Sequence, residues 1–414
     1  MDGVSRTAGR ALCLALAAAG LLWGALFAWH PQGLEARVFF ERGRTFFADF
    51  RAVRTCAEGG FATDRQPLHD SCYPPLGALL AKPFPLTAGA WFTGTGMALW
   101  ALAFWTLLAR RDENGEDAPG RFPAVAGLAV VGCLLSSIML HAFEWGNQIL
   151  YAAAAVTLFV AWWDAPSPCR RAVAAVALAV AAVLKVSPTL LAGLYLVRWW
   201  MAQEAEVRRE SLRAGALFLA AAAVMFLVPF AWYDGWTGFC QWFANALANA
   251  AHYVHKGAWG FVPLDRTVRV LLHLDVSTPW PGIGLSRGLS AALGLACLGK
   301  TALCAYRRTC RTDDLLLLLV AAMLLIPGNM HVYTGLYLLP VLALRLRAGM
   351  RWTEAACWFA LLCPLQIPLG AGCLNHPLAN LAFLALVAEV LADAMNRLAP
   401  RRVRPPPVGG PPMV

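Results

Sequence analysis

An aspartate set among phenylalanines and arginines is the first candidate for chemistry in this chain. Asp49 lies in residues 34–55, where five phenylalanines alternate with five arginines. We expect this segment to lie along a membrane surface, with phenylalanines in the acyl boundary and guanidinium groups near the headgroups. A carboxylate held there can take a proton from a polar acceptor while a lipid-linked partner approaches from the side. The alternative is that Asp49 only pairs with Arg42, Arg51 or Arg54.

Polar residues are sorted into alternate gaps between the hydrophobic segments. Arginine clusters fill one set of gaps: Arg110, Arg111, Arg170, Arg171, Arg208, Arg209, Arg307, Arg308, Arg345, Arg347 and Arg397 onward. The other set holds Asp49, Tyr73, Glu144, Asn147, Gln148, Lys185, His252, His255, Asn329 and His331. Because arginine-rich loops stay in the cytoplasm, the second set is expected to converge on the opposite face, as in a membrane enzyme with an outward-facing active site.

The composition indicates the class of protein that positions these residues. Of 414 residues, 59% are hydrophobic and 14% are charged, which is more apolar sequence than a soluble core absorbs. Apolar stretches of helical length recur along the chain, so we predict an all-α polytopic membrane protein. The net charge of +10 comes from arginines beside these stretches. There the arginines set the orientation of the protein in the membrane and contact anionic lipids. We therefore expect no nucleic-acid partner.

The apolar stretches predict about twelve transmembrane helices with both termini in the cytoplasm. The expected spans are 11–29, 88–108, 123–140, 149–163, 172–184, 187–200, 212–232, 287–305, 314–327, 331–345, 352–368 and 377–395. The first is expected to remain as an uncleaved helix, since no small-residue cleavage site follows it.

Residues 172–200 are too long for one crossing of a hydrocarbon core of roughly 30 Å and too short for two full crossings. We expect a hairpin of two short helices, broken at Lys185-Val186-Ser187-Pro188, which keeps every later arginine cluster on the cytoplasmic side. Interrupted helices are tolerated where they line a protein cavity, so Lys185 is expected to point into one.

The chain is predicted to form one membrane domain over residues 1–400. Its outer loops are expected near 30–87, carrying interfacial helices, and near 233–286, followed by a disordered Pro-rich cytoplasmic tail at 401–414. The twelve cysteines show no metal-ligand spacing, and neither a metal nor another cofactor is indicated. Cys56 and Cys72 share the first outer loop, and they would pair only if that compartment is oxidising.

Several short motifs resemble those of the family-87 glycosyltransferases, integral membrane enzymes of the GT-C superfamily that are typified by polyprenyl-phosphate-mannose-dependent α-mannosyltransferases. Asp49-Phe50, a Gly59-Gly60 turn and Tyr73-Pro74-Pro75-Leu76 are similar to the first-loop signature of that family. Gly146-Asn147-Gln148-Ile149-Leu150, Lys185-Val186-Ser187-Pro188 and Pro327-Gly328-Asn329-Met330-His331 are similar to three later motifs. Ser187 stands where an aromatic residue is common. The resemblance covers most of residues 46–345.

The resemblance implies a GT-C fold and an inverting transfer of a sugar, most typically mannose, from a polyprenyl phosphate to a glycolipid or glycan hydroxyl. Asp49 matches the general base, with Asp64 and Asp70 as competing acids in an ordinary exposed loop. The chain has no DxD-type pair, which argues against a nucleotide-sugar substrate on the inner face. The implied site is in the inner membrane and faces the periplasm or exterior.

An anionic leaving phosphate needs positive or hydrogen-bond-donating neighbours. Lys185 is the first candidate for this contact, His331 the second and Arg266 the third. Each has a simpler alternative, because a lone Lys or His near a helix end often snorkels or is bound locally. Arg266 can equally be solvated or bound to a headgroup.

Five further residues are candidates for substrate binding. Carboxylates and amides can hold sugar hydroxyls, which suggests this role for Tyr73, Glu144, Asn147, Gln148 and Asn329; the alternative for 144–148 is the capping of a tight turn. Tryptophans of the second outer loop, such as Trp236 and Trp242, either stack on sugars or form the interfacial aromatic belt, and the belt is the simpler interpretation.

A secondary transporter or flippase is the main alternative, because about twelve helices and a Lys at a broken helix also suit a transport site. Two features oppose it: ionisable residues are nearly absent from the middle of the spans, and the two halves show no repeat. An inactive scaffold relative is a third possibility, which the intact Asp49 and Lys185 argue against.

Overall fold

The structure is a computed structural model that describes residues 2–30, 46–61, 73–110, 122–256, 283–308, 311–327, 331–365, 368–369, 372–373 and 375–396. Over these residues the chain is helical apart from one antiparallel ladder, in which β1 (Pro368–Leu369) pairs with β2 (Gly372–Cys373). The expected all-α class is therefore confirmed. The proposed tail, residues 401–414, lies outside the described residues.

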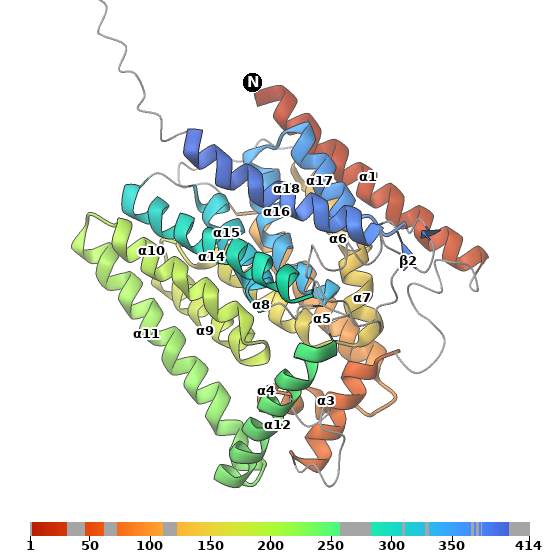
Figure 1. Ribbon diagram of the computed structural model, residues 1–414, viewed down its shortest axis with the longest axis vertical. Helices are drawn as coiled ribbons and strands as arrows, with labels where there is room; N and C mark the ends of the chain where they lie inside the picture. Colours follow the sequence, from red (N-terminus) through yellow and green to blue (C-terminus); the bar gives the residue numbers. More distant parts are fainter. Residues whose placement is uncertain are drawn as a thin grey trace, which may run out of the picture.

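Most of the helices pack side by side, and three others gather at one end of the molecule (Figure 1). The first group contains α1 (Asp2–Trp29), α5 (Gly89–Leu108), α6 (Phe122–Leu134), α7 (Ser137–Trp145), α8 (Ile149–Trp162), α9 (Pro168–Leu184), α10 (Gly193–Met201), α11 (Ala205–Leu227), α14 (Ile283–Arg307), α15 (Thr312–Leu325), α16 (Leu339–Ala348), α17 (Trp352–Leu362) and α18 (Asn375–Asn396). The three at the end are α3 (Ala48–Gly59), α4 (Pro75–Ala81) and α12 (Gly235–Lys256). Three 3-10 turns, η2 (Ser187–Ala192), η3 (Val228–Trp232) and η4 (Val332–Leu338), join longer helices.

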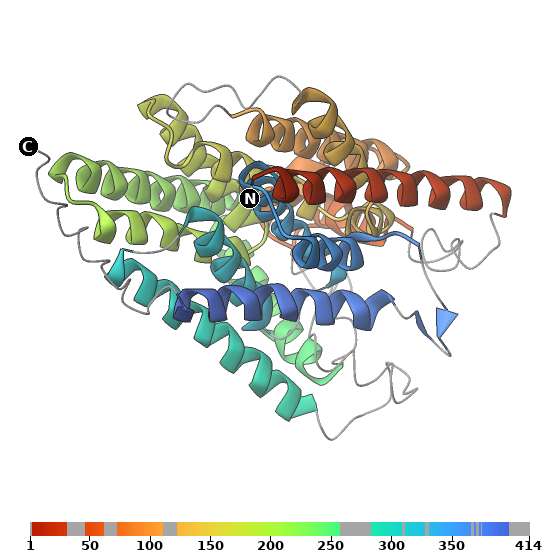
Figure 2. The ribbon, with the colours of Figure 1, turned by 90° about the horizontal axis from the view of Figure 1, so that it is seen from above.

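The core is built around helices that are apolar on every side. In α15 every residue from Leu315 to Leu325 is buried, and a helix that is hydrophobic all round belongs inside a bundle. Helix α8 is similar, and it packs between α5 and α9. At the periphery, α17 contacts both α1 and α18 (Figure 2). These packed helices form the frame that carries the loops.

Helix length and composition show a multi-pass membrane protein. Within the described residues, four helices are long and apolar enough to cross a membrane: Thr7–Trp29, Gly89–Leu108, Ala205–Trp232 and Gly284–Arg307. A fifth crossing is formed if Ala124–Leu134 and Ser137–Trp145, bent by 51° at their junction, count as one span. Each of the twelve expected ranges overlaps a helix or two consecutive helices, but twelve crossings remain a prediction.

The hairpin expected at residues 172–200 is confirmed. Helix α9 ends at Leu184, Lys185 is extended, and η2 and α10 follow. Glu210, near the start of α11, pairs with Arg171 at the start of α9 (2.5 Å) and with Arg198 at the end of α10 (3.7 Å). Since both outer ends of the hairpin meet the same carboxylate, the chain turns back at Lys185.

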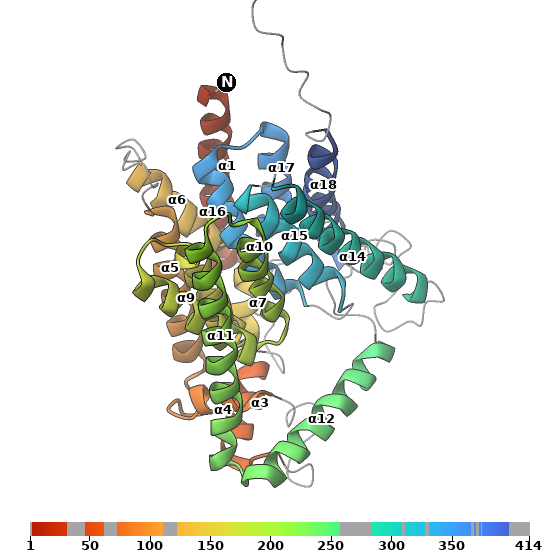
Figure 3. The same ribbon diagram turned by 90° about the vertical axis from the view of Figure 1, so that its left-hand side faces the viewer.

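The arginine-rich gaps meet at the end of the bundle opposite α3, α4 and α12 (Figure 3). Arg110 pairs with Asp164 (2.7 Å), and one cavity is lined by both of these residues together with Arg311, Asp313 and Arg347. Arg345 is shared among three carboxylates, those of Asp313, Asp314 and Glu354, at 2.5–3.5 Å. Segments far apart in the sequence thus bring their arginines to one end, as the sorting of polar residues predicted.

Candidate active site

Asp49 lies in the first turn of α3. The position of α3 is fixed by the tight turn between α7 and α8. The amide N of Phe47 donates to the carbonyl O of Glu144 (2.7 Å), which ties the start of α3 to the end of α7. Phe47 itself takes a left-handed conformation, with φ 54°. Beneath it, Gly146 ends α7 with φ +66°, and the Cα of Phe47 and the Cβ of Phe50 lie against it. The two turns fit together only because residue 146 has no side chain.

We expect Gly146→Ala to destabilise the protein by about 2–3 kcal/mol, since a Cβ is disfavoured in the left-handed region and would crowd its neighbours. A Cβ at this position would lie 2.8 Å from that of Phe50. The control is Gly235→Ala, because Gly235 also has a positive φ but a Cβ there meets open space. Thermal unfolding of the purified proteins should show a larger fall in Tm for Gly146→Ala. Equal falls would contradict the close packing of the two turns.

The Asp49 carboxylate accepts three hydrogen bonds from three separate parts of the chain. The Tyr73 hydroxyl donates to Oδ1 (2.8 Å), and the Asn147 Nδ2 and Tyr333 hydroxyl (3.4 Å) donate to Oδ2. A carboxylate offers about four lone-pair positions, so one position on Oδ1 remains for a further hydroxyl. Asp49 is half-buried, and within the described part of the chain no arginine forms an ion pair with it.

The nearby arginines of α3 have other partners. Arg51 donates to the carbonyl O of Phe46 (2.6 Å), and Arg54 donates to that of Phe84 (2.7 Å) and pairs with Glu58 (2.8 Å). Phe50 is fully buried against Phe92, with ring centroids 5.1 Å apart. The expectation that the phenylalanines of this segment face lipid is therefore wrong for Phe50, because α3 turns that side toward the bundle.

Asn147 and Gln148 belong to the turn that joins α7 and α8, and this turn contacts Asp49. The Asn147 Oδ1 accepts from the amide N of Ile149 (2.8 Å), so the side chain is fixed at the start of α8 while its Nδ2 faces Asp49. Gln148 is fully buried and donates to the carbonyl O of Leu184 (3.2 Å). Its Oε1 lies where a Cβ on Gly77 would stand. Gln148 thus joins α4 and α8 to the end of α9, next to Lys185.

Tyr73 links the carboxylate to a lysine. The prolines that follow it begin α4, with Pro75 in its first turn, and Trp242 of α12 donates to its carbonyl O (3.1 Å). The Lys185 Nζ lies 5.9 Å from the centroid of the Tyr73 ring, within the range of a cation–π contact. Asp49, Tyr73 and Lys185 thereby form one cluster, although 136 positions separate the first from the last.

His331 and Tyr333 close the site from the other half of the chain. Their rings stack with centroids 4.9 Å apart and an angle of 13°, and the carbonyl O of His331 accepts from the amide N of Thr334 (2.9 Å) at the start of η4. Sequence reasoning identified His331 and missed Tyr333. The only signal was its position two residues after that motif, in an apolar run that predicts core.

We expect Tyr333→Phe to lower the turnover rate about 2- to 10-fold, because it removes one hydrogen bond, worth about 0.5–1.5 kcal/mol, that orients the carboxylate. Tyr337→Phe is the control: this hydroxyl lies in the same 3-10 turn, is buried and has no hydrogen-bond partner among the described residues. Steady-state rates of the two variants should therefore differ. A Tyr333→Phe enzyme as fast as Tyr337→Phe would remove Tyr333 from the site.

The remaining predicted residues are placed as follows. Glu144 is buried, and its Oε2 lies 3.6 Å from the Nδ1 of His141. Cys56 is buried on α3. Arg266, Asn329, Cys72, Asp64 and Asp70 lie outside the described residues. Among the residues that the structure describes, no three His, Cys, Asp or Glu side chains lie together as metal ligands.

The site contains two neighbouring groups with different chemical abilities: the Asp49 carboxylate can accept a proton, and the Lys185 ammonium group can stabilise an anion. The carboxylate is oriented by Tyr73, Asn147 and Tyr333 and keeps a lone pair open, so a hydroxyl can be deprotonated there. The ammonium group of Lys185, beside the Tyr73 ring, can stabilise negative charge that develops nearby. The cluster lies with α3 and α4, at the end away from the arginines (Figure 1).

Comparison with known proteins identifies the family of the chain. The model of glycosyltransferase family 87 matches residues 72–327, which is more than half of the chain and includes Tyr73, Asn147 and Lys185. No curated protein matches the chain. Asp49, His331 and Tyr333 lie outside the matched region. The chain belongs to glycosyltransferase family 87.

Proposed function

We propose that this membrane glycosyltransferase moves mannose from a polyprenyl phosphate to a hydroxyl of a lipid-linked or glycan acceptor, on the face of the membrane away from the arginines. The observation that carries the proposal is the Asp49 carboxylate, held by Tyr73, Asn147 and Tyr333 with Lys185 beside Tyr73. Transfer from a lipid phosphate needs a base for the acceptor and a cation for the departing phosphate, and this cluster offers both.

In the proposed reaction Asp49 removes the proton of the acceptor hydroxyl as its oxygen attacks the anomeric carbon. The bond from that carbon to the phosphate oxygen breaks, and the electron pair leaves with the polyprenyl phosphate. Lys185, with His331 and Arg266 as further candidates, stabilises the negative charge on the leaving oxygen. Direct displacement inverts the configuration at the anomeric carbon. Glu144, Asn147 and Asn329 are the proposed residues around the sugar, and the buried Gln148 supports their turn.

The arrangement of charges supports an orientation for the protein. Arginine-rich ends of membrane proteins stay in the cytoplasm, so we infer that both termini are cytoplasmic and that the Asp49 site opens to the periplasm or exterior of an inner membrane. A lipid-linked donor suits that side, where nucleotide sugars are absent. About twelve crossings in a GT-C arrangement remain part of the proposal.

A donor panel tests the proposed function. The purified full-length protein, reconstituted into proteoliposomes with a membrane glycolipid extract, receives radiolabelled mannose, glucose or arabinose, each on polyprenyl phosphate, and GDP-mannose in a parallel reaction. We expect label in the acceptor from polyprenyl-phosphate mannose alone. Transfer from GDP-mannose in washed proteoliposomes would contradict the lipid donor. Movement of intact labelled lipid across the bilayer without transfer would favour the flippase alternative.

A further inference from the structure

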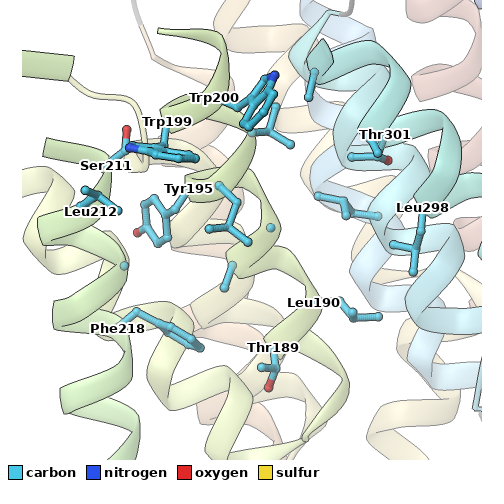
Figure 4. Close-up of a pocket in the computed structure, with 18 of the residues that line it drawn as sticks. Thr189, Leu190, Tyr195, Trp199, Trp200, Ser211, Leu212, Phe218, Leu298 and Thr301 are labelled. Atoms are coloured by element: carbon cyan, nitrogen blue, oxygen red, sulfur yellow. The ribbon is translucent and has the colours of Figure 1, made fainter. Parts of the chain in front are cut away.

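A large apolar groove lies between α10, α11 and α14 (Figure 4). Its volume is about 1020 Å³, at the upper end of the range of about 300–1,000 Å³ for small-molecule pockets. Leu190 of η2, Leu212 and Phe218 of α11 and Leu298 of α14 line it. Thr189 marks the end of the groove that is opposite Trp199 and Trp200. Its lining and its position on the outside of the bundle suit hydrocarbon chains.

A second, more polar cavity continues the groove at the tryptophan end. It has a volume of about 560 Å³ and is lined by Trp199, Trp200, Arg208, Tyr306 and Arg308; the three aromatic residues also line the groove. Trp and Tyr favour the level of the lipid headgroups. A hydrocarbon space therefore adjoins a pocket with two guanidinium groups at headgroup level.

The charge of this pocket is not neutralised by the neighbouring acids. Arg208 uses its Nε to donate to the carbonyl O of Ala202 (2.9 Å), and the described residues offer no carboxylate to its Nη groups. Glu210 is occupied by Arg171 and Arg198, and Glu206 lies at 3.7–4.0 Å from Arg209 and Arg213. The pocket thus keeps a positive charge that suits a phosphodiester.

We propose that this two-part cavity binds an anionic phospholipid of the arginine-side leaflet, with its phosphate between Arg208 and Arg308 and its acyl chains in the groove. The cavity is separate from the Asp49 cluster. Thr189, four residues after Lys185, lies at the end of the groove opposite Trp199 and Trp200, and these two tryptophans also line the arginine pocket. If the polyprenyl donor binds with its phosphate at Lys185, that phosphate does not occupy the arginine pocket. The arginine pocket is then available to the phosphate of a different lipid.

Lipid retention in native mass spectrometry tests the arginines. Purified full-length protein is titrated with phosphatidylglycerol and, in parallel, with phosphatidylcholine of the same chains. We expect Arg208→Gln/Arg308→Gln to lose roughly 25-fold in affinity for phosphatidylglycerol, roughly fivefold per arginine. Arg209→Gln/Arg213→Gln removes the same charge from exposed positions outside the cavity and should bind like wild type. Equal losses in the two double variants would overturn the proposal.

Filling the groove tests the acyl chains separately. Gly215 lines the groove, and a side chain at this position meets open space, so Gly215→Phe should fold and exclude the chains. Gly127→Phe, at a glycine of α6 that also faces open space, is the control. Phosphatidylglycerol should be lost from Gly215→Phe alone. Undiminished binding by Gly215→Phe, or displacement of phosphatidylglycerol by polyprenyl phosphate in wild type, would overturn the proposal.

Discussion

Replacing Asp49 with Asn should lower the rate of sugar transfer about 10²- to 10⁴-fold, the usual contribution of a general base. The amide keeps the shape of the side chain; with its oxygen toward Asn147 and Tyr333, its NH2 group can donate to the Tyr73 hydroxyl, so the contacts can persist. It has no basic oxygen to receive the acceptor proton, and kcat should therefore fall while KM changes little. Single-turnover transfer by the purified variant measures this effect.

Glu58→Gln is the matched control for that substitution. It makes the same chemical change on the same helix, at a half-exposed residue that pairs with Arg54, and it should leave the rate near that of wild type. Equal thermal unfolding of the three proteins excludes loss of structure. Transfer that survives in Asp49→Asn would move the base to Glu144, Asp64 or Asp70.

Replacing Lys185 with Met should lower kcat/KM about 10²- to 10³-fold, since removing one preorganised donor to a developing oxyanion has that cost in other enzymes. Met retains most of the apolar stem but carries no charge. Lys185→Arg keeps the charge at a different geometry and should recover part of the rate.

Lys82→Met separates this effect from a general loss of positive charge at the same end of the molecule. Lys82 caps α4 and is exposed, so its replacement should leave kcat/KM unchanged. Unchanged kcat/KM in Lys185→Met, together with a large loss in His331→Gln, would move the phosphate contact to His331.

Much of the fold could be predicted from the sequence because hydrophobic segments and arginines carry direct physical information. The hairpin at Lys185 followed from segment length and the need to keep later arginines on one side, and Glu210 shows that both of its arms meet. Helix α12 could not be predicted in this way. Its aromatic residues suggested a membrane belt, whereas Trp242 packs in the protein and donates to the carbonyl O of Tyr73.

The site was predictable where a polar residue stands in an unusual place. Asp49, Tyr73 and Asn147 each interrupt the local pattern, and in the structure Tyr73 and Asn147 both donate hydrogen bonds to Asp49. Tyr333 does not interrupt its pattern, and its contact with Asp49 joins residues 284 positions apart, so only the fold reveals it. Gln148 shows the opposite case: its polarity suggested a sugar contact, but it is fully buried and holds the end of α9.

The anomeric configuration of the transferred sugar is the most direct test of Asp49 as a base. Wild-type enzyme would be supplied with polyprenyl-phosphate mannose labelled with ¹³C at the anomeric carbon, and the product examined by NMR. Deprotonation of the acceptor and direct displacement predict a configuration opposite to that of the donor. A product with the configuration of the donor would exclude a single displacement from the opposite face, and Asp49 would not be the base proposed here.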